Sequence, residues 1–304
     1  MVSPILCHMQ LSVIIVSWNV RDHLRRCLQS IKDNTNNLEY EVIVVDNASH
    51  DGSIEMVASE FPEVKLIASN VNLGFGTANN RGVEIATGEV VFILNDDTVL
   101  TENSLRYVYD RVMGDKTIGV LGYHLFNADG SHQDSVRRYP RLSDQLLMLT
   151  KVHNLWSNLK PVKRYLAQDF DYSSEQEVDQ LMGACMVMRR DVYNQAGGFD
   201  ENFFVWFEEV DLEKRIHDEQ NLRVVYTPET SMIHVKGASF KQWMSLKSQR
   251  MFNKSMRTYF LKHYGLMRSI PILLMQPVSL VLAGLVGVFR RLGGNIQRFK
   301  NGQS

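Results

Sequence analysis

Cysteine is scarce in this chain, and its charges nearly cancel. Three cysteines among 304 residues stand far apart at Cys7, Cys27 and Cys185, so no pair has the spacing of a metal site or a redox motif. An odd and sparse set argues against a disulfide scaffold and fits a reducing compartment. The formal net charge of −1 indicates no nucleic-acid partner. A hydrophobic fraction of 44% is ordinary for a globular protein with a sizeable core.

A secretory signal is also missing from the first residues. No basic segment precedes the first apolar run, and Trp18-Asn19 follows that run where a cleavage site would stand. We therefore expect the body of the protein in the cytoplasm. Internal repeats and low-complexity tracts are absent as well.

Charge is absent from one long stretch near the C-terminus, Ser269–Phe289. Its length could span a bilayer, but Pro271 and Pro277 weaken a simple spanning helix. Four basic residues follow, which the positive-inside tendency holds on the cytoplasmic side: Arg290, Arg291, Arg298 and Lys300. Since the body is expected on that side too, a re-entrant or interfacial segment fits best, and residues 269–300 are expected to attach to the inner face of the cell membrane. A buried core helix, or a helix that covers a partner in a homodimer, is the alternative.

Short apolar runs alternate with amphipathic helical patterns through the first 125 residues. The runs predict buried strands at Leu11–Ser17, Tyr40–Val45, Val64–Ala68, Glu89–Leu94 and Gly119–Tyr123. Helices are predicted between them at Arg21–Lys32, Ser53–Phe61, Thr77–Ala86 and Thr101–Val112. This alternation predicts an α/β fold with a doubly wound, mostly parallel sheet. Ligands of such sheets bind beyond the carboxyl ends of the strands.

The remainder of the chain is less regular. Residues 128–177 have no clear period and are interpreted as loops and short helices on the side of a second substrate. Order returns in three predicted elements: a strand at Leu181–Arg189, a helix at Phe204–His217 and a strand at Arg223–Tyr226. We predict a nucleotide-binding half (1–125), an acceptor-binding and catalytic half (126–240) and a C-terminal apolar helical segment (241–304).

Adjacent acids follow the fourth apolar strand, in Asn95-Asp96-Asp97. Neighbouring carboxylates repel one another unless a cation joins them, and Mg²⁺ or Mn²⁺ takes oxygen ligands beside a substrate's phosphates. A metal–diphosphate site is one interpretation, and a solvated turn is the other.

Two polar turns end in the same predicted crevice. Asp46 and Asn47 follow the second strand, where a carboxylate can accept hydrogen bonds from a nucleobase or a ribose, although a plain Asx-turn would have the same composition. The stretch Asn72–Gly82 has glycines two apart, but Asn79 stands where a dinucleotide fingerprint needs a third glycine. Its backbone N–H groups can still meet a phosphate or a ribose before a helix.

Paired acids occur again at Glu208-Glu209, behind several aromatic residues. On a helix, Glu208 and Asp211 share one face, while Glu209 points about 100° away. A carboxylate that is partly shielded from water has a raised pKa and suits proton abstraction, whereas an acidic first turn that favours the helix dipole is the alternative. His234, placed just after a strand, is either a metal ligand or a structural histidine.

Taken in order, these stretches resemble the family-two inverting glycosyltransferases with the GT-A fold, and in detail the bacterial rhamnosyltransferases. The resemblance extends from about Leu11 to Ser239. It depends on the following stretches: Val16–Asn19, Asp46–Ser53, Asn72–Gly82, Leu94–Thr98, Gly197–Asp200 and Glu208–Arg215.

The resemblance implies a role for each matching residue. Nucleotide-sugar contacts fall on Ser17, Trp18, Asn19, Asp46, Asn47, Asn72, Gly74, Asn79 and Asp96. A Mg²⁺ or Mn²⁺ ion falls on Asp97, Asn95 and His234, with Asn95 where the family more often has an acid. The catalytic group falls on Glu209, with Glu208 and Asp211 beside it. The implied donor is a dTDP- or UDP-sugar, with rhamnose the leading sugar, and the implied acceptor is a glycan or a lipid-linked glycan.

Two other functions share parts of this pattern. A nucleotidyltransferase would have a basic, glycine-rich loop after the first strand, but Trp18–Arg26 contains no glycine. A sugar-nucleotide-binding protein without turnover would have no need of the complete set of carboxylates and His234.

Overall fold

A computed structural model describes residues 9–152, 158–235 and 245–301, with side chains of the last helix described as far as Leu285. Cys7 and the side chains of the basic residues predicted to follow the apolar segment, from Arg290 onward, lie outside this description. The chain divides into two compact units. The first comprises Met1–Tyr139, Phe170–Phe204 and Glu208–Lys241, and the second comprises Pro140–Asp169, Val205–Phe207 and Gln242–Ser304.

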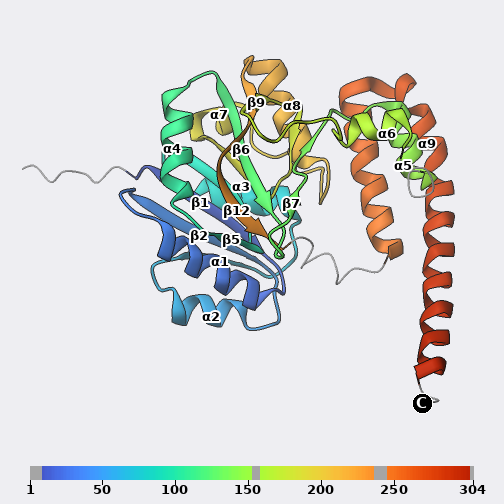
Figure 1. The fold of residues 1–304 in the computed structure, drawn as a ribbon, viewed down its shortest axis with the longest axis horizontal. Helices are drawn as coiled ribbons and strands as arrows, with labels where there is room; N and C mark the ends of the chain where they lie inside the picture. Colours follow the sequence, from blue (N-terminus) through green and yellow to red (C-terminus); the bar gives the residue numbers. More distant parts are fainter. Residues whose placement is uncertain (1–8, 153–157, 236–244, 302–304) are drawn as a thin grey trace, which may run out of the picture. The chain divides into compact units, whose positions relative to one another are not determined.

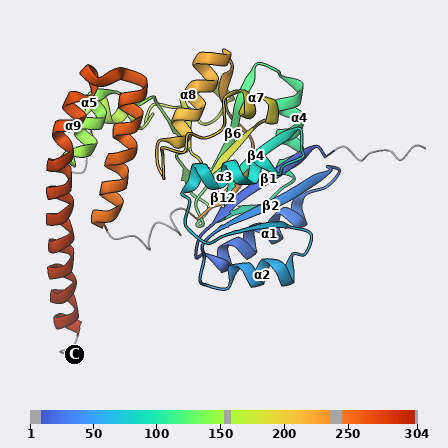
Figure 2. The ribbon, with the colours of Figure 1, turned by 180° about the vertical axis from the view of Figure 1, so that it is seen from behind.

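The first unit is built on one large mixed sheet (Figures 1 and 2), with the strand order β3-β2-β1-β4-β11-β6-β12-β5. Its strands are β1 (Leu11–Ser17), β2 (Tyr40–Asn47), β3 (Lys65–Ser69), β4 (Val90–Asn95), β5 (Thr98–Leu100), β6 (Ile118–Phe126), β11 (Cys185–Arg189) and β12 (Arg223–His234). Short strands extend it or pair beside it: β7 (His132–Gln133), β8 (Val136–Arg137), β9 (Gln176–Glu177) and β10 (Gln180–Leu181). Strands β1 to β4 are parallel, as predicted, and β11 pairs antiparallel to β4.

Helices cover both faces of this sheet because the central strands are apolar on both sides. Leu11, Val13 and Ile15 belong to the cluster that packs with α1 and α4, while Ile14 faces α3. A Cβ at Gly82 of α3 would lie 2.4 Å from Ile14 Cγ2, so this helix needs glycine to approach the sheet. The helices of the unit are α1 (Arg21–Asn34), α2 (Ser53–Glu60), α3 (Phe75–Glu84), α4 (Ser104–Gly114), α7 (Arg190–Gln195) and α8 (Glu208–Gln220).

Strand register gathers the polar strand ends at one edge. Ser17 pairs with Asp46, and Val16 pairs with Asn95, so β1, β2 and β4 end together. Asp96 and Asp97 form the turn from β4 into β5. Because β5 pairs antiparallel with β12, His234 stands opposite Thr98. The predicted crevice at the carboxyl ends of the parallel strands therefore includes a residue from a distant, later strand.

Three of the differences from the predicted elements affect the candidate site. Helix α8 begins at Glu208 and not at Phe204, because Trp206 and Phe207 have φ of 65° and 70°, which a right-handed helix cannot include. The predicted strand at Leu181–Arg189 is two strands, β10 and β11, interrupted around Gly183. Strand β12 continues beyond Tyr226 to His234, so this histidine ends a strand and does not follow one.

The second unit is helical, with α5 (Leu142–Leu149), α6 (Lys160–Tyr165) and α9 (Ser245–Asn301). Gly265 has φ of 73° and divides α9 into two helices, which lie side by side in Figures 1 and 2. Helix α5 packs against α9, and the hydroxyl of Tyr264 donates to the carbonyl of Pro140 (2.7 Å). Within the described residues, Leu246–Leu285 is the one segment long and apolar enough to cross a membrane.

Candidate active site

The turn after β4 and the end of β12 place an acid against a histidine. Asp97 Oδ1 lies 3.2 Å from His234 Nε2, and both side chains are almost completely buried. Asn95 Nδ2 lies 3.4 Å from the same ring nitrogen. The backbone holds the contact, because the N–H of Val235 donates to the carbonyl of Asp97 (2.9 Å). The three residues predicted as metal ligands are thus brought together.

Gln133 on β7 fixes the orientation of the His234 ring. Its Oε1 lies 2.6 Å from His234 Nδ1, while its Nε2 donates to the carbonyl of His234 (3.1 Å) and to Asn127 Oδ1 (2.6 Å). Since the amide nitrogen is engaged elsewhere, Oε1 must accept a proton from Nδ1. In the neutral ring, Nε2 then turns its lone pair toward the Asp97 carboxylate. Two electron-rich atoms at this distance need a proton or a cation between them.

Sequence reasoning did not find Gln133. The residue lies in the stretch interpreted as irregular loops, and a lone glutamine there carries no periodic or motif signal. Strand β7 pairs with β6, and β6 is the neighbour of β12 in the sheet, so this pairing brings Gln133 to His234 at the end of β12.

Asp96 is buried beside Asp97 at the same turn. Burial raises its pKa well above the ordinary value for an aspartate, and the neighbouring Asp97 charge raises it further. Hydrogen bonding from Ser17 and from the backbone of Trp18 opposes that rise. The end of β1 therefore contacts the acidic turn, as the shared strand ends predicted.

Hydrogen bonds between side chains and backbone groups connect the residues that follow β1 with those that follow β2. Asn19, in the left-handed region at φ 53°, donates its N–H to Ser49 Oγ (2.9 Å), and its Oδ1 accepts from the N–H of His50 (2.7 Å). Asp46 Oδ1 accepts from the N–H of Ser49 (2.9 Å). The other Asp46 oxygen, Oδ2, is buried and has no hydrogen-bond partner among the described residues. A buried carboxylate oxygen of this kind is suited to accept from a ligand's N–H or O–H.

Asn47 fastens the glycine-containing loop before α3. Its Nδ2 donates to Asn72 Oδ1 (3.1 Å) and to the carbonyl of Gly74 (3.0 Å), and its Oδ1 accepts from the N–H of Leu73 (2.7 Å). Gly74 has φ of 83°, and a Cβ there would lie 2.2 Å from the carbonyl oxygen of Phe204. Asn79 is fully buried and donates to the carbonyl of Phe75 (3.0 Å). These residues shape the loop, and the complete burial of Asn79 favours a structural role for this residue.

The Glu208-Glu209 pair begins α8 beside the segment that connects β10 to β11. A Cβ at Gly183 would lie 3.7 Å from the Cβ of Glu209, and the next residue, Ala184, accepts from the N–H of Asn95 (3.2 Å). A Cβ at Gly76 of α3 would likewise lie 3.7 Å from the Cβ of Glu208. The segment between β10 and β11 thus connects the paired acids to Asn95, more than a hundred positions earlier in the chain.

Glu209 has the properties of a general base. Its Oε2 is buried and has no hydrogen-bond partner among the described residues, while the residue as a whole keeps partial exposure. Burial raises its pKa to about 7. One turn further, Glu213 Oε1 accepts from the N–H of Leu181 (2.9 Å), and burial raises its pKa as well. Near neutral pH, Glu209 is therefore poised between its protonated and ionised forms.

Asp211 occupies a different environment from Glu209. It is fully buried and accepts from Arg215 Nε (2.9 Å), whose guanidinium also donates to the carbonyls of Ala196 and Gly198. This ion pair holds the Gly197-Gly198 turn against α8. The geometry favours a positioning role for Asp211, and its predicted catalytic role stays a prediction.

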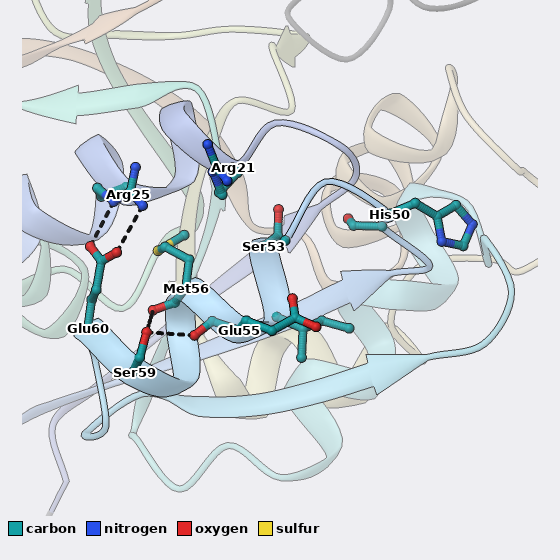
Figure 3. Close-up of a pocket in the computed structure, with 11 residues that line it drawn as sticks. Arg21, Arg25, His50, Ser53, Glu55, Met56, Ser59 and Glu60 are labelled. Carbon is teal, nitrogen blue, oxygen red and sulfur yellow. Dashed lines mark hydrogen bonds and ion pairs between the residues drawn. The ribbon is translucent and has the colours of Figure 1, made fainter.

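A separate open pocket of about 590 Å³ lies between α1 and α2 (Figure 3). Arg25 forms a two-pronged ion pair with Glu60 at one end, and His50 stands at the other. None of the lining residues is a predicted site residue, although Ser49 and His50 contact Asn19. The acids of the candidate site lie elsewhere.

The described residues contain no group of three or more His, Cys, Asp or Glu side chains arranged to hold a metal ion. The protein ligands available at the turn are two, Asp97 and His234, with the Asn95 amide beside them. A hard divalent cation is commonly held by one or two protein ligands when a substrate's phosphates complete its shell. The donor set and the facing Nε2 and Oδ1 atoms therefore fit a metal that binds together with a diphosphate.

A family model and two relatives of known sequence all belong to the glycosyltransferases. The family model described as Glycosyl transferase family 2 matches residues 12–197. The N-acetylglucosaminyl-diphospho-decaprenol L-rhamnosyltransferase of Mycobacterium tuberculosis is 31% identical over 240 residues, covering 75% of this chain and 77% of that protein. The rhamnosyltransferase WbbL of Escherichia coli is 26% identical, covering 73% of this chain and 82% of that protein.

Solved structures share the fold at low identity. The mannosyltransferase PcManGT of Pyrobaculum calidifontis, in complex with GDP-Man and Mn²⁺, has a TM-score of 0.56 at 18% identity, covering 91% of this chain and 73% of that one. Staphylococcus aureus TarS 1–349 has a TM-score of 0.52 at 16% identity, covering 90% of this chain and 81% of that one.

Proposed function

The chain belongs to glycosyl transferase family 2, and from that premise we propose that it is a metal-dependent, inverting transferase. Its donor is a dTDP- or UDP-sugar, with rhamnose the leading sugar, and its acceptor is a hydroxyl of a lipid-linked glycan precursor. Relatives named rhamnosyltransferases at 26–31% identity support the sugar and the acceptor. We further propose that the reaction takes place at the inner face of the cell membrane.

The contact between Asp97 and His234 is the observation that carries this proposal. With Gln133 accepting from Nδ1, the Nε2 lone pair and the Asp97 carboxylate face the same point, and Asn95 adds an amide there. These residues would hold Mg²⁺ or Mn²⁺. When bound, such an ion neutralises the charge that grows on the departing diphosphate.

The nucleotide is expected at the joined ends of β1 and β2. Asp46 Oδ2 accepts from the base or the ribose, and Ser17, Trp18 and Asn19 line the pocket. Asn47, Asn72 and Gly74 hold the loop whose backbone faces the same edge. Asp96 contacts Ser17 and orients the turn from which Asp97 projects.

Glu209 removes the proton from the acceptor hydroxyl. The acceptor oxygen forms a bond to the anomeric carbon as the bond from that carbon to the diphosphate breaks, and Glu209 retains the proton. A single displacement inverts the anomeric centre and needs one base and no protein nucleophile. Glu208 shares the start of α8 and is the second candidate for this role.

Donor hydrolysis in the absence of acceptor tests the function most simply. A panel of nucleotide sugars is incubated with the full chain and Mg²⁺ or Mn²⁺, with and without EDTA. We expect one donor to be cleaved to its nucleoside diphosphate and EDTA to stop the cleavage. In a parallel incubation with nucleoside triphosphates and sugar 1-phosphates, release of pyrophosphate would indicate a nucleotidyltransferase. Binding of a donor without cleavage of any would indicate a non-catalytic protein. A bound donor at a hundred times its dissociation constant should stabilise the fold by about 2.7 kcal/mol in a thermal-shift screen.

Replacing Gln133 should weaken metal binding without loss of any direct ligand. Gln133→Leu removes the acceptor that sets the His234 ring, and partners of this kind are typically worth about 10–100-fold in metal affinity. Titration of Mn²⁺ by electron paramagnetic resonance, with the nucleoside diphosphate present, measures the change. Gln133→Glu, which keeps an acceptor for Nδ1, should recover much of the affinity. Equal Mn²⁺ affinity in the leucine variant and the unaltered protein would contradict this role.

A further inference from the structure

The part of α9 after Gly265 exposes a row of apolar side chains and buries several polar ones. After Gly265, six of the exposed apolar residues on α9 form one helical stripe, spaced three or four apart: Met267, Ile270, Leu274, Val278, Val281 and Leu285. Met267 is 78% and Leu274 71% exposed. Monomeric proteins in water rarely leave a continuous apolar stripe uncovered.

The opposite side of the same helix is buried and contains polar side chains beside the apolar Ile272 and Ala283. Ser269 and Ser279 are fully buried, and Ser279 Oγ accepts from Asn253 Nδ2 on the preceding part of α9 (2.7 Å). Gln276 Nε2 donates to the carbonyl of Asn253 (2.7 Å), and Gln249 Nε2 donates to Asn253 Oδ1 (2.9 Å). Polar side chains therefore join the two parts of α9, while Leu, Met and Val face outward. This arrangement suits a helix pair whose outer face meets hydrocarbon.

Charge identifies the kind of surface that the stripe contacts. Of the 33 Lys and Arg residues of the chain, twelve lie in residues 230–304, while none of the 34 Asp and Glu residues does. On the first part of α9, four exposed cations form a stripe of their own: Lys247, Arg250, Lys254 and Arg257. Apolar and basic side chains in one segment without acids match an anionic lipid surface. The same excess of positive charge disfavours a second copy of this chain as the partner.

We propose that α9 lies in the interfacial plane of an anionic bilayer, with the stripe Met267–Leu285 inserted among the acyl chains and the basic residues at the headgroups. The bonds between Asn253 and Gln276 and Ser279 place the basic part of α9 alongside the middle of the apolar part. A spanning orientation of the apolar part would carry those exposed cations into hydrocarbon, which is costly. An interfacial orientation keeps them in contact with lipid phosphates. The inference extends the proposed function, which places the acceptor in a lipid.

Flotation of the full chain with vesicles tests the proposal. The chain should float with vesicles of phosphatidylcholine and phosphatidylglycerol, and far less with phosphatidylcholine alone. Raising the salt from about 0.1 to about 1 M, which shortens the screening length from about 10 to about 3 Å, should release most of it. Retention in high salt would contradict the interfacial orientation and favour a span. Equal binding to neutral vesicles would contradict the role of charge.

Matched variants identify the surface. Leu274→Glu should lower vesicle affinity at least tenfold, whereas Val71→Glu, at a site in the first unit that is 61% exposed, should not change it. Replacing Arg250, Lys254 and Arg257 with glutamine should lower affinity about a hundredfold, since each basic residue near an anionic surface strengthens binding about fivefold. Unchanged vesicle affinity in the Leu274→Glu variant would overturn the proposal. So would an unaltered protein that binds no vesicles and sediments as a dimer, if the Leu274→Glu variant sediments as a monomer. Vesicle binding needs no donor and donor hydrolysis needs no vesicle, so the two proposals fail separately.

Discussion

Glu209→Gln is expected to lower the transfer rate about 10²–10⁴-fold, which is the usual contribution of a general base. Glutamine keeps the size of the side chain and cannot take the acceptor's proton. Because Glu209 Oε2 has no hydrogen-bond partner among the described residues, the change breaks no described bond of that oxygen, and the fold should persist. Single-turnover transfer from a labelled donor, with circular dichroism to monitor folding, measures both expectations.

Three further variants assign the base. Glu219→Gln, on an exposed position of the same helix, should leave the rate unchanged. Glu208→Gln should reduce it less than Glu209→Gln. A larger loss in the Glu208 variant than in the Glu209 variant would move the base to Glu208, and full activity in a Glu208→Gln/Glu209→Gln double variant would remove the mechanism.

The pH profile should follow the ionisation of the same carboxyl group. Burial raises the pKa of Glu209 from 4.5 to about 7, and only the ionised form accepts a proton, so the rate should rise as the pH increases through about 7. The folded chain then holds more protons than the unfolded chain between these two values, so the free energy of unfolding should fall as the pH rises across that window. A transfer rate that stays flat from about pH 5 to about pH 8 would contradict the assignment of Glu209 as the base.

Asp97→Ala is expected to lower transfer about 10²–10³-fold, the typical loss when one group that stabilises developing charge is removed. The variant also removes the carboxylate that faces His234 Nε2 and should abolish the dependence on Mn²⁺. Titration of Mn²⁺ with the nucleoside diphosphate present, together with donor hydrolysis, measures the effect.

An exposed carboxylate provides the control for Asp97. Asp129, bonded to Ser131 on an exposed turn, can be replaced by alanine with no expected effect on Mn²⁺ affinity. Normal Mn²⁺ affinity in Asp97→Ala would show that the cation, if bound, is held elsewhere.

The sequence predicted the part of the site that depends on strand ends. Ser17, Asp46 and Asn95 each follow an apolar run, and parallel strands place such ends at one edge, which the observed register confirms. The GT-A fold and the glycosyltransferase class were likewise accessible, because they depend on motifs in a fixed order.

The other features of the site depend on contacts between residues that are far apart in the sequence, or on the local backbone conformation. The position of Gln133 follows from a two-residue strand with no pattern of its own, and the start of α8 follows from left-handed backbone at Trp206 and Phe207. The apolar character of residues 269–289 was evident from the sequence, but which side of the helix is exposed depends on bonds from Asn253, 23 positions before Gln276. Local periodicity contains none of this information.

A crystal structure of the full chain with Mn²⁺ and a nucleoside diphosphate tests the central assignment most directly. We expect an anomalous Mn²⁺ peak about 2.2 Å from an Asp97 oxygen and from His234 Nε2, with the diphosphate completing the shell of the metal and Glu209 facing the open space beside it. A metal bound away from Asp97 and His234, or Glu209 on a surface that shares no cavity with the diphosphate, would contradict it.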